Sequence, residues 1–284
     1  MRRRRGHAVL TPVRPGGRVC QWMLYALALI ATLIVAPTAA RACVEQTPCF
    51  LGDRSYHVKL PDTWDGVSPM PVMLHFHGWQ RQGTLIVKHG RISGATRRVG
   101  VLLLAPTGRR KTWNFWSDQS EDIAFARRVL EDAARTYPID RSRIYISGYS
   151  YGAAMAWRFV CADGAGVAAL LAVSGTLDQD EDCAGAVPVR HVHGLRDTVM
   201  DFPMGPGGDT THPVALWRRQ NGCAGPPQEV RDWSVTKHDT FTRHVWRDCT
   251  SDKPVTLDLH ARGHFIPRGW FRQQLDELLA EPTH

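Results

Sequence analysis

The sequence of 284 residues lacks several features that would assign it to particular classes of protein. It has no internal repeat, no low-complexity tract and no long linker, which excludes repeat proteins and mainly disordered chains. Its longest apolar run has 14 residues, fewer than the roughly 20 that a membrane-spanning helix needs. Its seven cysteines include no C-x-x-C pair, which disfavours a structural zinc site. The composition that remains is that of a soluble globular protein.

Acidic residues are absent from the first 42 positions, and this absence explains the formal net charge of +8. Seven of the 35 basic residues lie there: Arg2, Arg3, Arg4, Arg5, Arg14, Arg18 and Arg41. Without them, 28 basic residues face 27 acidic ones, so the rest of the chain carries a net charge of only +1. No basic face is left over to bind phosphates, and we therefore expect no nucleic-acid partner.

The same 42 residues have the parts of a secretory signal peptide. A basic start, "MRRRR", precedes the apolar run at 23–36, and "ARA" at 40–42 fits the small-x-small rule for cleavage. We expect a signal peptide over 1–42 that is cut after Ala42, and one folded domain over 43–284, extracellular or periplasmic. An uncleaved membrane anchor stays open as the alternative. After cleavage we expect no contact with the membrane.

Six cysteines remain once Cys20 leaves with the signal segment. An even number of cysteines in an exported protein indicates disulfides. Pairing sequence neighbours closes the shortest loops and requires no crossing of the core, which favours Cys43–Cys49, Cys161–Cys183 and Cys223–Cys249. Other pairings stay open, because six cysteines can be connected in many ways.

Strand and helix patterns alternate along the chain after position 42. Continuous apolar runs and alternating segments predict strands at 55–61, 71–78, 99–106, 143–148, 167–175, 187–194, 240–249 and 254–261. Apolar residues at helical spacing predict helices at 121–137, 151–161, 213–222 and 268–280. This alternation predicts an α/β fold with a mostly parallel, doubly wound sheet in a single domain.

Ser150 lies between Gly148 and Gly152 in "RIYISGYSYGAAMAW", residues 143–157, where a predicted strand turns into a predicted helix. This context is typical of a nucleophile elbow. The glycines remove Cβ atoms where the strand and helix approach each other, and the helix N-terminus favours developing negative charge. The structural alternative is an ordinary turn in which Ser150 only caps the helix.

A nucleophilic serine needs a base, and the base needs an acid that orients it. In this architecture the acid and then the histidine follow the serine, on loops after later strands. Asp197, just beyond the strand at 187–194, is the expected acid, and Asp201 is its competitor. His264 lies before the last helix and is the expected base, whereas His260 fits the strand pattern of a core residue.

The negative oxygen that forms during acyl transfer needs two backbone donors. The N–H of Tyr151, directly after the serine, is the first candidate. The second belongs to the loop after an early strand, where "LHFHGW" offers Gly78 or Trp79. The sequence does not separate these two.

Aromatic residues follow the strand at 99–106 in "KTWNFW". Ligands of open α/β sheets bind at the carboxyl ends of the strands, so Trp113, Trp116 and the neighbouring His77 are candidates for a substrate pocket. Packing of the aromatic residues in the core is an equally good interpretation.

Two H-x-H pairs offer an alternative chemistry: His75 with His77, and His191 with His193. Side chains two apart on a strand share a face, so each pair could ligate zinc. A hydrolytic zinc site also needs further ligands such as a carboxylate, and no such set follows either pair. We therefore expect no metal and no cofactor, and interpret these histidines as buried residues beside the site.

Four segments together resemble a known family: "LHFHGW", "EDIAFARRVLEDAARTYPIDRSRIYISGYSYGAAMAWRF", "HVHGLRDTVM" and "ARGHFIPRGW". They are similar to the exported polyhydroxybutyrate depolymerase-like esterases, a group related to feruloyl and acetylxylan esterases of the α/β-hydrolase fold. The resemblance covers about residues 49–278. It implies Ser150 as nucleophile, Asp197 as acid and His264 as base.

The sequence also departs from this family in two places. Tyr151 is bulky where the family usually has a small residue, and "GHFIP" replaces the frequent "GHTWP" around His264. Bulk beside the nucleophile bears on the choice of substrate and leaves the three side chains intact. Four cysteines resemble those of the family: Cys161, Cys183, Cys223 and Cys249.

The sequence therefore predicts an exported serine carboxylic-ester hydrolase that acts through an acyl-enzyme on Ser150, on a small or oligomeric ester. A serine peptidase or acyltransferase on the same fold is the first alternative. A secreted binding protein without catalysis is the second. The natural ester, its acyl length and the oligomeric state stay open.

Overall fold

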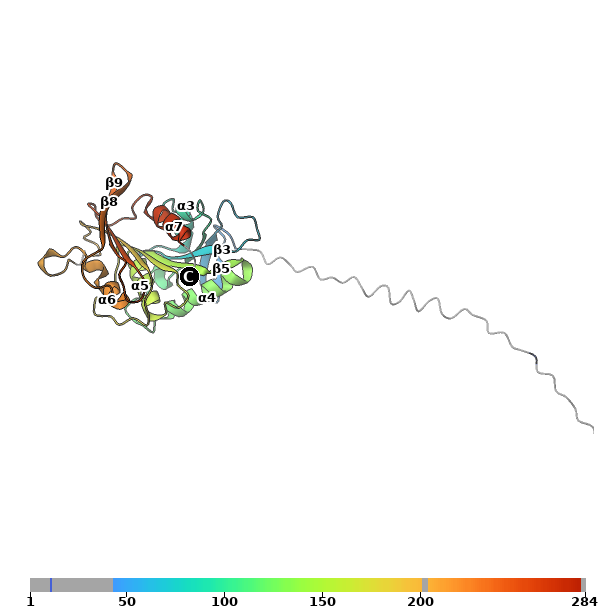
Figure 1. The fold of residues 1–284 in the computed structure, drawn as a ribbon. Coiled ribbons are helices and arrows are strands. Elements are labelled where there is room, and N and C mark those ends of the chain that lie inside the picture. Colours follow the sequence, from blue (N-terminus) through green and yellow to red (C-terminus); the bar gives the residue numbers. More distant parts are fainter. Residues whose placement is uncertain (1–10, 12–42, 201–203, 282–284) are drawn as a thin grey trace, which may run out of the picture. The chain divides into compact units, whose positions relative to one another are not determined.

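The computed structural model describes residues 11, 43–200 and 204–281 (Figure 1). The predicted signal peptide, except Thr11, and the competitor Asp201 lie outside these residues. All the elements below belong to the compact unit that begins at Ala42. In the described ranges, no helix combines the length and the apolar character that crossing a membrane requires.

Within the described residues, ten strands form one sheet in the order β1-β2-β4-β3-β5-β6-β7-β10-β9-β8. Their bounds are Cys49–Leu51 (β1), Arg54–Lys59 (β2), Met70–Phe76 (β3), Leu102–Pro106 (β4), Ile139–Tyr149 (β5), Ala169–Val173 (β6), Val189–Gly194 (β7), Glu229–Thr236 (β8), Asp239–Trp246 (β9) and Val255–His260 (β10). In this order, the neighbouring strands β4, β3, β5, β6, β7 and β10 are parallel to one another. Antiparallel pairings extend the sheet at both edges, through β2 and β1 beside β4 and through β9 and β8 beside β10. The mostly parallel sheet predicted from the sequence is confirmed.

Helices cover both faces of this sheet (Figure 1). Their bounds are Gly83–Val87 (α2), Ser93–Thr96 (α3), Glu121–Thr136 (α4), Tyr151–Ala162 (α5), Ala215–Asn221 (α6) and Trp270–Ala280 (α7), with short 3₁₀ turns at Arg109–Lys111 (η1), Pro206–Gly208 (η2) and His212–Val214 (η3). Buried side chains of α4, α5 and α6 share one core with the sheet, and those of α2, α3 and α7 share the other. Strands β3, β4 and β6 are buried along their whole length and mainly apolar, because both of their faces are covered.

Two of these helices end where the sequence places their signals. The hydroxyl of Ser120 accepts a hydrogen bond from the N–H of Asp122 at the start of α4, and Pro138 follows its end. Helix α6 ends at Gly222, whose φ of 70° is the left-handed conformation that glycine adopts readily.

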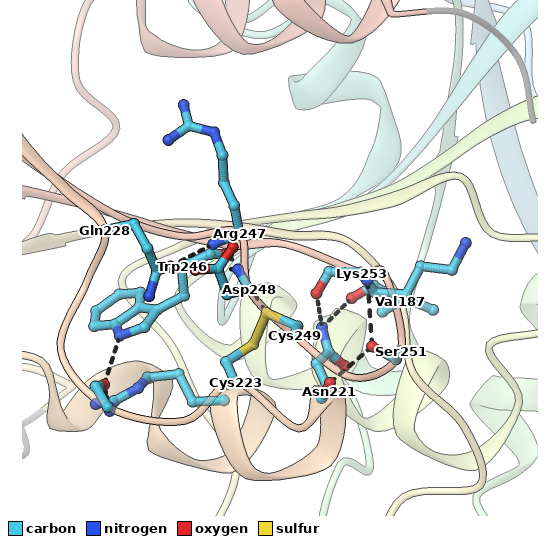
Figure 2. The surroundings of a disulfide bond; sticks show 12 residues. Val187, Asn221, Cys223, Gln228, Trp246, Arg247, Asp248, Cys249, Ser251 and Lys253 are labelled. Atoms are coloured by element: carbon cyan, nitrogen blue, oxygen red, sulfur yellow. Dashed lines mark hydrogen bonds between the residues drawn. A yellow bond between two sulfur atoms is a disulfide. The ribbon is translucent and has the colours of Figure 1, made fainter.

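Three disulfides join the pairs expected from the sequence: Cys43–Cys49, Cys161–Cys183 and Cys223–Cys249. Figure 2 shows the third, beside Asn221 at the end of α6. The Asn221 amide donates hydrogen bonds to the carbonyl oxygens of Val187, at 2.7 Å, and Lys253, at 2.9 Å. These two residues precede β7 and β10, so Asn221 connects the end of α6 to the amino ends of two parallel strands.

Candidate functional site

The predicted site residues gather at the opposite edge, where the parallel strands end. Ser150 directly follows β5, Asp197 lies in the loop after β7, and His264 lies in the loop after β10. Strands β3 and β4 end at the same edge, so the loops that follow them begin there. This is the edge at which open α/β sheets bind their ligands.

Ser150 has the backbone of a sharp strand-to-helix turn. Its φ is 58° and its ψ is −127°, a conformation that costs a non-glycine residue about 1–3 kcal/mol. Its N–H donates to the carbonyl of Val173 at 2.9 Å, and its side chain makes no capping hydrogen bond to α5. The alternative interpretation of Ser150 as an ordinary helix cap therefore has no support in this geometry.

The two flanking glycines permit this turn. A Cβ atom on Gly148 would overlap the carbonyl group of Gly152, and one on Gly152 would overlap the carbonyl group of Phe76 at the end of β3. Any larger residue would therefore push α5 away from the sheet. The glycine pattern holds the turn tightly against the strand that precedes the "HGW" loop.

Asp197 and His264 are joined directly. Nδ1 of His264 lies 2.7 Å from Oδ2 of Asp197, whose side chain is completely buried. Oδ1 of Asp197 accepts the N–H groups of Val199, at 3.0 Å, and Met200, at 3.1 Å. Burial acts to raise the pKa of Asp197, but the hydrogen bond with His264 and those from the two N–H groups outweigh it and lower this pKa. The carboxylate is therefore ready to orient an imidazole.

Tyr149 links this pair to the serine turn. The Tyr149 ring lies 4.9 Å from the His264 ring, centre to centre, and its hydroxyl donates to the His264 carbonyl at 3.3 Å. Because Tyr149 directly precedes Ser150, these contacts bring the backbone of His264 to the turn. His260, in contrast, is buried at the end of β10, in the core position expected for it.

The loop after β3 lies against the serine turn. A Cβ atom built on Gly78 would lie 3.6 Å from Cβ of Ser150. Among the described residues, none accepts a hydrogen bond from the N–H of Gly78 or Trp79. Tyr151 begins α5, so its N–H is one of the free donors at a helix N-terminus. Gly78 and Trp79 both remain candidates for the second oxyanion donor.

His77 holds this loop from inside the protein. Contrary to our expectation, it does not line an open pocket. It is fully buried, its Nδ1 lies 2.8 Å from the Gly78 carbonyl oxygen, and its Nε2 accepts the N–H of Gly108 at 3.0 Å. Because a carbonyl only accepts, the ring proton belongs on Nδ1. Burial lowers the pKa of His77 to about 4, so the ring is neutral at pH 7.

Trp113, the second pocket candidate, is part of the core. Only 1 % of its surface is exposed, and its indole N–H donates to the His77 carbonyl at 2.7 Å. Its ring packs edge-on against Phe76, 5.0 Å away. The core interpretation is therefore correct for Trp113, because a side chain this buried leaves no surface for a substrate.

Trp116, the third pocket candidate, is 65 % exposed and belongs to an aromatic cluster of Phe115, Trp116 and Tyr151. Its ring stacks on Phe115 at 4.1 Å, and both rings meet the edge or face of Tyr151, at 5.2 Å from Phe115 and 6.1 Å from Trp116. Because Tyr151 directly follows Ser150, this aromatic cluster lies beside the candidate nucleophile. Trp116 stays a candidate for contact with a substrate.

His191 and His193 are buried beside the site, as the sequence predicted, but the sequence did not reveal their contacts. Nε2 of His191 lies 3.1 Å from Nδ1 of His193, and Nε2 of His193 lies 3.6 Å from Oδ2 of Asp197. The spacing of four residues between His193 and Asp197 was the one available signal. Within the described ranges, no group of three or more His, Cys, Asp or Glu side chains could hold a metal ion.

Comparisons with known proteins agree with this fold. No family model matches the chain. The chain is 25% identical over 225 residues to feruloyl esterase D of Neurospora crassa, covering 74% of this chain and 73% of that protein. It is 24% identical over 217 residues to a bifunctional acetylxylan esterase/xylanase of Neocallimastix patriciarum, covering 74% of this chain and 31% of that protein.

A solved structure supports the fold independently. The acetyl xylan esterase from Aspergillus awamori superimposes with a TM-score of 0.56 at 13% identity, over 80% of this chain and 94% of that one. At this identity the likeness shows the fold alone. Together, the comparisons confirm the resemblance predicted from the sequence, the hydrolase fold and the enzyme class, a carboxylic-ester hydrolase.

Proposed function

We propose that this chain, an α/β-hydrolase related to feruloyl and acetylxylan esterases, is an exported serine esterase that works through an acyl-enzyme on Ser150. Oγ of Ser150 attacks the ester carbonyl while Nε2 of His264 takes its proton. That proton then passes to the leaving alcohol, and Asp197 orients the imidazole throughout. The supporting observation is the 2.7 Å bond between His264 and buried Asp197, beside a serine in a strained turn.

The second half of the reaction uses the same groups. Water gives a proton to His264 and attacks the acyl carbon, and the proton returns to Ser150 as the carboxylic acid leaves. In both halves, the N–H of Tyr151 and that of Gly78 or Trp79 hold the negative oxygen. The contact between His264 and Asp197 is observed, and the proton transfer between Ser150 and His264 is proposed.

The aromatic cluster favours an ester with a planar or aromatic acyl group. Trp116 presents its ring to solvent next to Tyr151, and flat rings stack well on such surfaces. A feruloyl-type ester therefore fits this side of the site better than a hydroxybutyrate chain. The three disulfides support an oxidising, extracellular or periplasmic location.

A fluorophosphonate probe tests the nucleophile, because it reacts only with an activated serine. We expect labelling of the wild type and none of Ser150→Ala, with hydrolysis of p-nitrophenyl acetate falling at least about 10⁴-fold. Ser142→Ala is the matched control, because Ser142 lies at the other end of β5. Labelling that persists in Ser150→Ala, or is absent from the wild type, would remove the assignment.

Substrate panels separate the esterase from its alternatives. We expect hydrolysis of a p-nitrophenyl ester at least about 10³-fold faster than that of the matching anilide, because the chain resembles esterases. A comparable rate on the anilide would favour a peptidase. Among esters, feruloyl and acetyl substrates compared with hydroxybutyrate oligomers test the acyl preference, and equal rates would contradict a role for the aromatic cluster.

A further inference from the structure

The carboxylate of Asp197 lies between two histidines. His264 contacts Oδ2 from the side of the site, at 2.7 Å. His193 faces the same oxygen from inside the protein, with its Nε2 at 3.6 Å. The reaction proposed above uses only the first histidine, so the second is a buried titratable group without a part in it.

The orientation of the His193 ring follows from its neighbours. Its Nε2 faces the Asp197 carboxylate, and the ring also interacts with the backbone of Met200 in a way that favours a ring N–H. The 3.6 Å separation is longer than a hydrogen bond, but a carboxylate attracts an N–H and repels a lone pair, so the ring proton belongs on Nε2. Nδ1 of His193 is then an acceptor, and it meets Nε2 of His191 at 3.1 Å. His191 thus fixes the tautomer that points an N–H at Asp197.

His193 is neutral at pH 7. Burial lowers its pKa to about 4, against the opposing effect of the Asp197 charge. The other titratable groups that face it are His191 from the same strand, His260 from β10, and His264. A neutral donor can hold the carboxylate without neutralising it, whereas a charged one would compete with the imidazolium that forms on His264.

His193 is also anchored more rigidly than the other donors to Asp197. It lies one residue before the end of β7, which pairs with β6 on one side and β10 on the other. The two N–H groups on Oδ1 come instead from the turn at 197–200, where Val199 is 66 % exposed. Among the described residues, His193 is the side chain that links the Asp197 carboxylate to the interior of the sheet.

We propose that His193 is a positioning residue for Asp197: its Nε2–H faces Oδ2 across 3.6 Å and its ring interacts with the turn at 197–200, while His191 fixes its tautomer. This inference rests on the proposed function, in which Asp197 orients His264. An N–H that faces Oδ2 from inside the protein attracts part of the negative charge of the carboxylate away from His264. His193 therefore sets both the position of the His264 ring and its basicity.

Two substitutions at this position separate the effect of the Nε2–H from that of the bulk of the ring. His193→Leu removes the donor, and we expect kcat on p-nitrophenyl acetate to fall about tenfold with KM unchanged. The acid limb of the pH–rate profile should move up by about 0.5 to 1 pH unit, because an unshared carboxylate stabilises the His264 imidazolium more strongly. His193→Gln keeps an N–H near the same place, so its kcat and acid limb should stay within about twofold and about 0.2 pH units of the wild type.

The matched control is His75→Leu, which removes a buried histidine from β3 that bonds to Ser147. We expect this control to lower the melting temperature and leave the acid limb in place. If His193→Leu does not fold, His191→Phe carries the test, because it keeps the ring stacking and removes the donor to Nδ1. Its acid limb should move in the same direction by a smaller amount.

The outcomes distinguish this inference from the proposed function. The positioning role would be overturned if folded His193→Leu, or His191→Phe in its place, kept the kcat and acid limb of the wild type. That result would leave the proposed esterase function standing. An acid limb that shifts equally in His75→Leu would also overturn it. A wild type that hydrolyses none of the esters would instead overturn the proposed function.

Discussion

The same four-residue pattern, H-x-H-G, lies across the end of β3 and at the end of β7, yet the two patterns have different partners. The second histidine of the first pattern, His77, directly follows β3 and bonds to backbone groups of Gly78 and Gly108. In β7 the second histidine, His193, faces the Asp197 side chain. The pattern marks the carboxyl end of a parallel strand, and the loop that follows decides what the histidine contacts.

The first histidines of the two patterns also differ, because they face opposite layers of the molecule. His75 bonds to Ser147 at 2.6 Å and meets the edge of Phe271 on α7. His191 meets Trp157 on α5 and bonds to His193. The β7 pair is therefore one connected unit that leads to the acid, whereas the β3 histidines bond to separate partners.

The largest effect should come from breaking the acceptor at the end of β7. Asp197→Asn keeps the size of the side chain but presents an N–H or a weaker acceptor to His264, so the imidazole loses its proper tautomer. We expect kcat on p-nitrophenyl acetate to fall about 10⁴-fold. The control Asp178→Asn, in the loop after β6, should keep full activity. A fall below about tenfold in Asp197→Asn would show that another group serves as the acid.

Breaking the β3 end should have a smaller effect of a different kind. His77→Leu frees the Gly78 carbonyl and the loop that offers the second oxyanion donor. We expect kcat to fall about 10- to 100-fold, since removing an oxyanion donor outright costs about 10²- to 10³-fold. The acid limb should stay in place, unlike that of His193→Leu. His57→Leu on β2 is the control for burial, and an acid-limb shift in His77→Leu would erase the contrast between the two ends.

The smallest effect concerns stability, in which the two strands should behave alike. Burial lowers the pKa of His75 to about 3, below its usual value, so the unfolded chain binds the proton more readily than the folded one. This histidine's contribution is fully present above about pH 6.5 and is lost as the pH falls toward about 3. Between pH 7 and 5 it should remove about 2 kcal/mol of unfolding free energy.

Urea unfolding at the two pH values measures this contribution. The loss of stability from pH 7 to pH 5 should be smaller in His75→Leu than in the wild type, even though the variant is less stable at pH 7. His191→Phe should flatten the dependence in the same direction, because burial also lowers the pKa of His191. Equal pH dependence in the wild type and both variants would mean that these histidines accept protons while folded.

The sequence predicted the central sheet well, because strands covered on both faces are mainly apolar. It also predicted α4 and α6 closely, through Pro138 and Gly222. It missed β8, an edge strand whose side chains are mostly exposed and therefore show no apolar pattern. It also missed α2 and α3, which have five and four residues and are too short to repeat a helical stripe.

For the site, the sequence supplied candidates and the structure supplied their contacts. The order of motifs along the chain pointed to Ser150, Asp197 and His264, and the structure joins the last two directly. It could not show that Trp113 packs in the core, because exposure depends on elements far away in the chain. For the contact of His193 with the acid it gave only the spacing of four residues, since a contact between a strand and its following loop depends on how that loop turns.

The two glycines around Ser150 are required by packing, whatever chemistry the serine performs. A side chain at 148 or 152 would collide with main-chain carbonyls, one of them on the neighbouring strand. A related protein that had lost its activity would still need both glycines to keep α5 packed on the sheet. The Gly-x-Ser-x-Gly pattern therefore does not distinguish active relatives of this enzyme from inactive ones. Substitutions at 197 and 264 would identify the inactive relatives first.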